Sequence, residues 1–337
     1  MSKLWWAIWM AGAMLLAAGG WVLYAPAMPR AEAPRAYTPP ATDQPITPLP
    51  ARLQLDARKV ALGRRLFHDR RLSRDDTVSC ASCHLMSRGG ADARALAVGI
   101  DGKTNTVNTP TVLNSGFNAS QFWDGRAGSL EEQAAGPVHN PVEMASKWHE
   151  VITKLRRDAE YPRAFAEIWP DGITAANIQS ALADFERGLI TPDAPFDRYL
   201  RGETQALSPL AQRGWALFRD LGCIACHQGV NVGGNMYANL GVMGDYFADR
   251  DKPVLKSDLG RFNVTGREED RHMFKVPGLR NVERTAPYFH DGSVATLGEA
   301  VDLMARYQLG IRLEPEQREA LLAFLASLNG TLPKDEQ

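Results

Sequence analysis

Apolar positions follow a helical period over much of the chain after residue 50. Residues 56–67 and 208–218 are each amphipathic, and each ends in Gly-x-x-Leu-Phe. A third helical pattern covers residues 175–189 and is broken at Thr191-Pro-Asp-Ala-Pro195. Strand-like alternation is scarce, and the connections are long and rich in Gly and polar residues. The pattern therefore predicts an all-α fold with long loops.

A long apolar stretch precedes this body. Leu4 to Tyr24 carries no charged side chain, and its 21 residues would span the roughly 30 Å hydrocarbon core as a helix. A cleaved signal peptide has a shorter apolar region, although Ala25-Pro-Ala27 resembles a cleavage site. We expect residues 1–27 to be a signal anchor, with a cleaved signal peptide as the alternative. Both readings export the rest of the chain.

Eight prolines between Pro26 and Pro50 predict an extended tether over residues 28–50. The body should then divide into residues 51–195 and 196–330, followed by a tail at 331–337, because domains usually have about 100–200 residues. Lys plus Arg number 38 and Asp plus Glu 39, so no basic excess indicates nucleic-acid binding.

All four cysteines lie in two C-x-x-C-H motifs. These are Cys80-Ala-Ser-Cys83-His84 and Cys223-Ile-Ala-Cys226-His227. In this motif two thiols form thioether bonds to haem, and the adjacent His binds the iron. A zinc site would need its cysteine pairs much closer together, and two disulfides would not explain the histidines. The motifs predict two covalent haem c groups with His84 and His227 as axial ligands.

The sixth ligand of each iron stays open at this stage. A Met thioether suits electron transfer, whereas an open position suits chemistry on a small molecule. The methionines that follow the motifs are Met86 and Met144 in the first half and Met236, Met243, Met273 and Met304 in the second. Thr296-x-x-Glu299 is a capping box that would place Met304 on a rigid helix.

Further motifs resemble those of bacterial dihaem cytochrome c peroxidases, over about residues 50–330. In the first half they are Thr109-Pro-Thr-Val-Leu-Asn114, Gln121-Phe-Trp-Asp-Gly-Arg-Ala127, Leu130-Glu-Glu-Gln133 and Asn140-Pro-Val-Glu-Met144. In the second half they are Phe274-Lys-Val-Pro277, Leu279-Arg-Asn281, Pro287-Tyr-Phe-His-Asp-Gly292 and Ala300-Val-x-x-Met304.

The resemblance implies two cytochrome-c-like helical domains that reduce hydrogen peroxide to water. The haem on His84 would be the low-potential peroxidatic group. The haem on His227, with Met304 as distal ligand, would be the high-potential group that receives electrons. The donor would be a small redox protein, a cytochrome c or a cupredoxin, or a membrane quinol pathway. The expected location is the periplasm, with the chain anchored to the inner membrane.

The resemblance also assigns site residues. Trp123 matches the Trp between the haems, Gln133 and Glu143 match the polar pair over the peroxidatic iron, and Asn108, Thr285 and Pro287 match an interdomain calcium site. A carboxylate can carry a proton from one peroxide oxygen to the other, and an amide can orient the peroxide.

One position departs from the family pattern. Many members carry a His about 16 residues after the first axial His, which blocks the peroxidatic iron until the other haem is reduced. Here that position is Ile100, and no His lies between His84 and His139. We therefore expect an open first haem that needs no reductive activation, with His139 a neighbour rather than a ligand. We expect His290 to have a structural or electron-transfer role rather than a catalytic one.

Two other functions are weighed against this one. The first is a dihaem oxidase acting on a protein or organic substrate, like the quinone-cofactor-maturing relatives, which use a Tyr where Met304 stands. The second is an electron-transfer cytochrome, against which Gln133, Glu143 and the missing His argue. A homodimer is common in the family, but no interface can be read from the sequence.

Overall fold

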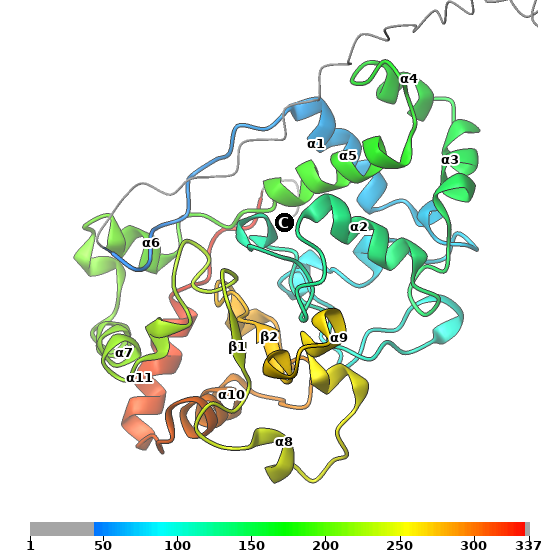
Figure 1. The fold of residues 1–337 in the computed structure, drawn as a ribbon. Coiled ribbons are helices and arrows are strands. Elements are labelled where there is room, and N and C mark those ends of the chain that lie inside the picture. The colour runs from blue at the N-terminus through cyan, green and yellow to red at the C-terminus, as the bar shows by residue number, and fades with distance from the viewer. Residues whose placement is uncertain (1–43, 334–337) are drawn as a thin grey trace, which may run out of the picture. The chain divides into compact units, whose positions relative to one another are not determined.

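The structure is a computed structural model that describes residues 44–333, and all of these belong to one compact unit. The longer helices are α1 (Ala57–Phe67), α2 (Leu130–His139), α3 (Trp148–Arg156), α5 (Ala175–Gly188), α7 (Pro209–Asp220), α10 (Leu297–Met304) and α11 (Pro315–Ala326). The short ones are α4 (Tyr161–Ala166), α6 (Pro195–Leu200), α8 (Tyr246–Asp249) and α9 (Phe262–Thr265) (Figure 1). The expected fold class is confirmed as mostly helical.

The described part contains one small sheet, in which β1 (Tyr237–Asn239) pairs antiparallel with β2 (Met273–Lys275). The long segment 229–262 contains β1 and α8. The expected membrane segment, Leu4 to Tyr24, lies outside the described residues. Among residues 44–333 no helix combines the length and apolar character needed to cross a membrane.

Each half is built on one close helix crossing. A Cβ at Gly63 of α1 would lie 1.9 Å from the Ala181 carbonyl oxygen of α5. A Cβ at Gly214 of α7 would lie 1.9 Å from the Ala320 carbonyl oxygen of α11. Only glycine permits these two crossings, which explains why Gly-x-x-Leu-Phe occurs in both halves.

Two separate apolar cores form around these crossings. The first includes Leu66, Phe67, Leu155, Phe165, Ile178 and Phe185. The second includes Phe196, Trp215, Phe218, Phe324 and Leu328. The buried members of the first core lie between Leu62 and Leu189, and those of the second lie between Phe196 and Leu328, apart from Ile46. In addition, Ile46 is buried in the second core and Leu49 N–H donates to Asp197, so the packed chain begins a few residues before the expected position 50.

The repeat extends beyond the cysteine motifs. Phe122 and Phe289 both have φ of 69°, inside turns closed by the bridges Gln121–Ala127 and Tyr288–Val294. Each turn leads to a helix capped by a hydroxyl group: Ser129 accepts from Glu132 N–H, and Thr296 accepts from Glu299 N–H. The chain therefore follows the same path twice, and positions in one half can be matched to the other.

Thr191 joins the two halves at the centre. Asn114 and Asn281 occupy matching left-handed positions, with φ of 60° and 61°. Both side chains donate to the Thr191 hydroxyl oxygen, at 2.9 and 2.8 Å. Because all three residues are buried, these bonds fix the relative placement of the two halves.

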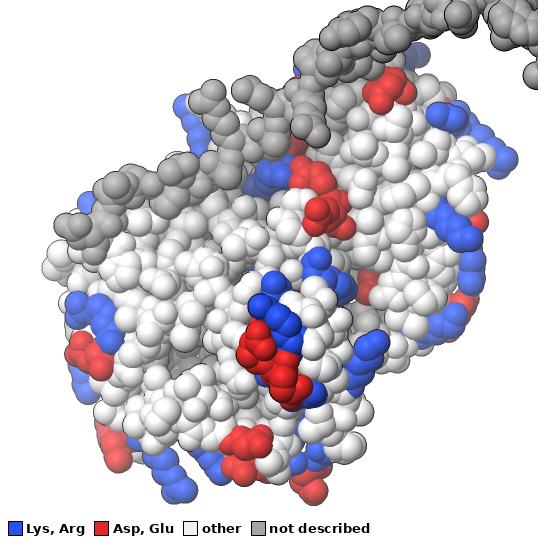
Figure 2. Space-filling model, viewed as in Figure 1, with Lys and Arg blue, Asp and Glu red and all other residues white. Residues whose placement is uncertain are grey.

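Charged side chains are mixed on the surface. Figure 2 shows positive and negative groups interspersed, with no extended area of a single sign on the face shown. This agrees with a formal net charge of −1.

Candidate active site

The first C-x-x-C-H motif forms a tight turn at Cys80–Ser82. His84 Nδ1–H donates to the carbonyl oxygen of Gly90 at 3.0 Å, which leaves Nε2 as the ring atom available to a metal. Burial lowers the pKa of His84, and the carbonyls of Gly90 and Pro110 oppose this effect. The imidazole is therefore neutral and oriented, as an iron ligand must be.

The second motif repeats this arrangement at Cys223–Ala225. Burial lowers the pKa of His227 to about 4, opposed by the carbonyls of Val232 and Pro277. These two carbonyls lie near the ring, but the buried Nδ1 atom of His227 makes no hydrogen bond within residues 44–333. Pro110 and Pro277 occupy matching positions of the repeat, so both histidines face the same kind of backbone.

These residues fit two covalent haem groups. None of the four cysteines, all within the described part of the chain, forms a disulfide, and each is half-buried. Burial raises the pKa of Cys83 and of Cys223 to about 11, so both are thiols rather than thiolates. Within residues 44–333 no group of three or more His, Cys, Asp or Glu is arranged to hold a metal ion.

Glu143 lies beside the first motif. Asn105 and Asn140 both donate to its Oε1 atom, at 2.7 and 2.8 Å, and no hydrogen bond among the described residues uses Oε2. Burial raises the pKa of Glu143, while the two amides and the charge of Arg126 oppose the rise. The charge of Glu143 in turn raises the pKa of Cys80 and Cys83, as expected for a neighbouring group.

Ile100 packs directly against the Glu143 segment. Its N–H donates to the Glu143 carbonyl oxygen at 2.8 Å, and its side chain is fully buried. A Cβ at Gly99 would lie 2.6 Å from Glu143 Cα, so the loop can approach this closely only with glycine there. His139 is occupied elsewhere: Nδ1 bonds the Ser146 carbonyl and its ring packs edge-on to Trp148.

Gln133 projects from α2, whose residues Ala134 and Val138 pack in the first core. The Gln133 side chain is half-buried and makes no hydrogen bond to the described residues. Ser129, the N-cap of α2, accepts from Glu132 N–H, and the Glu132 carboxylate accepts from Gly128 N–H.

Trp123 connects the two halves. Its ring Nε1–H donates to the Asn108 carbonyl at 3.0 Å, and its own carbonyl accepts from Lys275 N–H at 2.8 Å. Asn108 N–H donates in turn to the His290 carbonyl at 2.8 Å. His290 is buried, with Nε2 bonded to the Asp258 carboxylate at 2.7 Å and its ring stacked on Phe274.

Met304 is the last residue of α10. The capping box at Thr296 and Glu299 is confirmed, since each side chain bonds the backbone N–H of the other. A π-helical segment, Ala305–Leu309, follows directly, and such segments are frequent at functional sites. Leu297 and Val301 of α10 pack against the same core as Cys223, so the helix borders the second motif.

Two of the other methionines are less suited as ligands. Met144 is buried in the first core, where it acts as a filler. Met243 is 62% exposed.

The three residues expected to bind calcium, Asn108, Thr285 and Pro287, are only partly brought together. Asn108 Nδ2–H donates to the Arg94 carbonyl at 2.8 Å, and the Asn108 backbone contacts the segment that begins at Pro287. The Thr285 hydroxyl donates to the Val282 carbonyl. Among the described residues no hydrogen bond joins Asn108 to Thr285.

Comparison with known proteins identifies the family. The sequence model named "Di-haem cytochrome c peroxidase" matches residues 57–205. The chain is 49% identical to the cytochrome c peroxidase Ccp of Escherichia coli (strain K12), over 87% of this chain and 62% of that protein. It is 43% identical to the cytochrome c551 peroxidase of Nitrosomonas europaea, over 87% of this chain and 86% of that protein. The chain belongs to the di-haem cytochrome c peroxidase family.

A solved structure supports the same conclusion. The chain is similar to a MauG-like protein associated with microbial copper homeostasis, with a TM-score of 0.73 and 32% identity. The match covers 88% of this chain and 96% of that protein. The helical fold of this di-haem cytochrome c peroxidase is thus found in a related protein.

Family membership confirms several expectations. The chain is an oxidoreductase of the cytochrome c peroxidase class, which acts on peroxide, and the family implies two haem c groups. The names of the relatives imply hydrogen peroxide as substrate and a redox partner as donor. The chain spans 62% of the E. coli protein, so nothing is carried over from the remainder of that protein.

The structure also shows residues of this peroxidase that the sequence did not single out. Asn105 and Asn140 hold Glu143, the buried Glu186 lies close enough to Cys80 to affect its pKa, and Lys275 is buried on β2. Asn140 begins a segment that resembles the family, but nothing in the sequence indicated that its amide would bond Glu143. Asn105 and Glu186 carry no local signal, because only the fold brings them to the first motif.

Replacement of Glu186 by Gln is expected to stabilise the protein at neutral pH. Glu186 is buried on α5, and burial raises its pKa to about 8 from the model-peptide value of 4.5. Below pH 4.5 the carboxyl is protonated in both states. Between pH 4.5 and 8 only the unfolded state ionises, so stability falls as pH rises, by about 3 kcal/mol at pH 7.

The Glu186→Gln variant should lose this pH dependence and unfold about 5 °C higher or more at pH 7. Thermal unfolding of the holoprotein between pH 4.5 and 8 measures both effects. Glu316→Gln, at an exposed position of α11, is the matched control. Parallel pH profiles for Glu186→Gln and the parent protein would show that Glu186 is ionised when folded.

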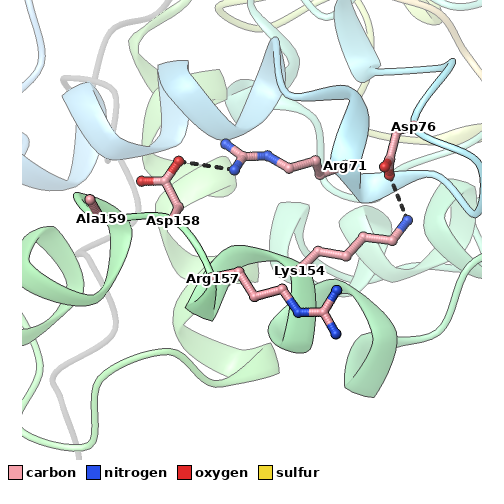
Figure 3. Close-up of a pocket in the computed structure, with 6 residues that line it drawn as sticks. All are labelled: Arg71, Asp76, Lys154, Arg157, Asp158 and Ala159. Carbon is pink, nitrogen blue, oxygen red and sulfur yellow. Dashed lines mark hydrogen bonds and ion pairs between the residues drawn. The ribbon is translucent and has the colours of Figure 1, made fainter.

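An open depression elsewhere on the surface is not part of this site. It is lined by Arg71, Asp76, Lys154, Arg157, Asp158 and Ala159 (Figure 3). Four of its five charged side chains are paired, Arg71 with Asp158 at 2.9 Å and Lys154 with Asp76 at 2.6 Å. None of its residues was predicted as a site residue, and we assign it no role.

Proposed function

We propose that this peroxidase reduces hydrogen peroxide at the haem held by Cys80, Cys83 and His84. Electrons then arrive through the haem held by Cys223, Cys226 and His227. Haem iron supplies the peroxide-binding and electron-transfer chemistry when it is bound. The observation that carries this division is a difference between the two matched helices α2 and α10.

Met304 is the eighth residue after Thr296, the N-cap of α10. The eighth residue after Ser129, the N-cap of α2, is Pro137. A thioether sulfur can bind iron, whereas a proline side chain has no atom that can. The repeat therefore supports Met304 as sixth ligand in the second half and an open position in the first.

Glu143 is the proposed proton carrier. Its Oε1 is held by two amides, and its Oε2 is left to accept a proton from one peroxide oxygen and deliver it to the other. A raised pKa suits this task, because proton transfer is most efficient when the pKa lies near the working pH. Gln133, whose amide makes no hydrogen bond to the described residues, is proposed to orient the peroxide.

Trp123 is proposed to lie on the electron path between the haems. Its indole N–H and its carbonyl are bonded to residues of opposite halves, Asn108 and Lys275. The backbone of Trp123 is thus bonded to one half and its ring to the other, which supports a constant position of the ring between the two halves.

The first haem is proposed to be open as isolated, because Ile100 replaces the blocking His and is fully buried. Electron paramagnetic resonance of the fully oxidised protein should show a high-spin first haem. The oxidised protein should react with peroxide without prior reduction of the second haem. Reduced small cytochrome c, supplied afterwards, should then sustain peroxide consumption. A purely low-spin bis-His signal from the first haem would contradict an open site.

The alternative is a dihaem oxidase acting on a protein or organic substrate. The similarity to a MauG-like protein favours it, whereas Met304 in place of a Tyr argues against it. Peroxide-dependent oxidation of reduced cytochrome c separates the two functions. An open first haem that fails to turn over peroxide with this donor would favour the alternative.

Three finer features belong to the same proposal. The chain is exported to the periplasm through residues 1–27, which anchor it to the inner membrane. A calcium ion binds at Asn108, Thr285 and Pro287, partly through backbone carbonyls. The donor is a small cytochrome c or cupredoxin, or a quinol pathway.

A further inference from the structure

Lys275 is a buried cation without a partner. Its side chain is 9% exposed, and it forms no ion pair and no side-chain hydrogen bond within residues 44–333. Burial lowers its pKa to about 8, and no acidic group opposes that effect. Buried lysines are rare unless paired, because an unpaired ammonium loses its hydration without compensation. The Lys275 ammonium therefore has no anionic partner among the described residues, and its Nζ atom is not one of the fully buried atoms without a partner.

The strand register indicates where the Lys275 side chain lies. Lys275 is paired with Tyr237 across the small sheet, so the two side chains share one face. The Tyr237 hydroxyl contacts Ser120 Oγ at 2.7 Å and the Gly125 carbonyl at 3.3 Å. Phe274, on the opposite face, stacks on His290. Lys275 thus faces the first-half turn that carries Trp123, at the junction of the halves.

The same strand leads to the second haem motif. Pro277, two residues after Lys275, has the carbonyl that opposes the pKa shift of His227. Lys275 therefore lies two residues from a backbone group that adjoins the axial His227 of the second motif.

The repeat gives an independent indication. Matching Pro110 with Pro277 makes Asn108 the counterpart of Lys275. Each donates its backbone N–H across the junction at 2.8 Å, Asn108 to His290 and Lys275 to Trp123. The repeat therefore places Asn108 and Lys275 at equivalent positions along the junction of the two halves.

We propose that Lys275 binds a propionate carboxylate of the haem held by Cys223, Cys226 and His227. A propionate is the anion that a bound haem brings into a protein interior, and it would compensate the buried ammonium. This inference rests on the two haem groups that the family implies, and not on the peroxide reaction. It can fail while the proposed function stands.

Lys275→Met and Lys275→Gln remove the charge, and Lys275→Arg keeps it. Redox titration of the holoprotein by absorption spectroscopy should show a lower midpoint potential for the second haem in both neutral variants. The expected change is about tenfold in the reduction equilibrium, or about 59 mV. The sign follows because loss of a nearby positive charge favours the ferric over the ferrous state. Lys275→Arg should stay within about threefold of the parent.

Lys256→Met, at an exposed position, is the matched control and should leave both potentials unchanged. Two haems per chain, measured by absorption, establish that each variant has folded and matured. If Lys275→Met fails this criterion, Lys275→Gln carries the test. Unchanged potentials in a neutral variant with full haem content would overturn the inference, and so would a shift confined to the first haem.

Discussion

Replacement of Glu143 by Gln is expected to lower kcat/KM for peroxide by about 10²- to 10⁴-fold. Gln keeps the shape of the side chain, and its oxygen can still accept from Asn105 and Asn140. It cannot take up a proton, so the transfer between the two peroxide oxygens loses its carrier. Each tenfold loss corresponds to about 1.36 kcal/mol of transition-state stabilisation. Steady-state peroxide consumption with a reduced small cytochrome c measures the effect.

The pH dependence separates this role from a structural one. Glu143 must be ionised to accept a proton, and burial raises its pKa. The parent protein should therefore lose kcat/KM as pH falls through that pKa, and Glu143→Gln should lack this acid limb. Glu319→Gln, at an exposed position of α11, should retain both the rate and the profile. A Glu143→Gln variant within twofold of the parent would assign proton transfer to another group.

The sequence predicts His84 and His227 as axial ligands, and two similar halves, from signals that are local. Two C-x-x-C-H motifs define His84 and His227 without any knowledge of the fold. The repeated Gly-x-x-Leu-Phe likewise predicted two equivalent helices, and the structure explains its glycine by the 1.9 Å approach of a carbonyl. The Thr296 capping box correctly placed Met304 on a helix.

The neighbours of these residues could not be predicted, because they meet only through the fold. Asn105 lies 38 residues before Glu143, and nothing in its surroundings indicates the 2.7 Å bond that joins them. In the sequence, Lys275 is only one residue of a family motif. Its burial, and the lack of an ion-pair partner among the described residues, are known only from the structure. The match of Pro137 with Met304 depends on aligning two helix caps, since α2 and α10 share few residues.

The difference between Pro137 and Met304 leads to the second large effect. Met304→Ala is expected to lower the midpoint potential of the second haem by an amount on the order of 0.2 V, within the roughly 0.8 V range that axial ligands control. A Met ligand favours the reduced state, and Ala offers no replacement. At 59 mV per tenfold, electron acceptance from the donor becomes about 10³-fold less favourable, and peroxide turnover should fall accordingly.

The control for Met304→Ala is Met243→Ala. Met243 lies in the same half, but its side chain is 62% exposed, so its loss should leave potential and turnover unchanged. Redox titration of each holoprotein, followed at the second haem, measures the change in midpoint potential in both variants. An unchanged potential in Met304→Ala would mean that another residue, with Met273 of β2 the next candidate, is the ligand. In that case the match with Pro137 would no longer explain why the two haems differ.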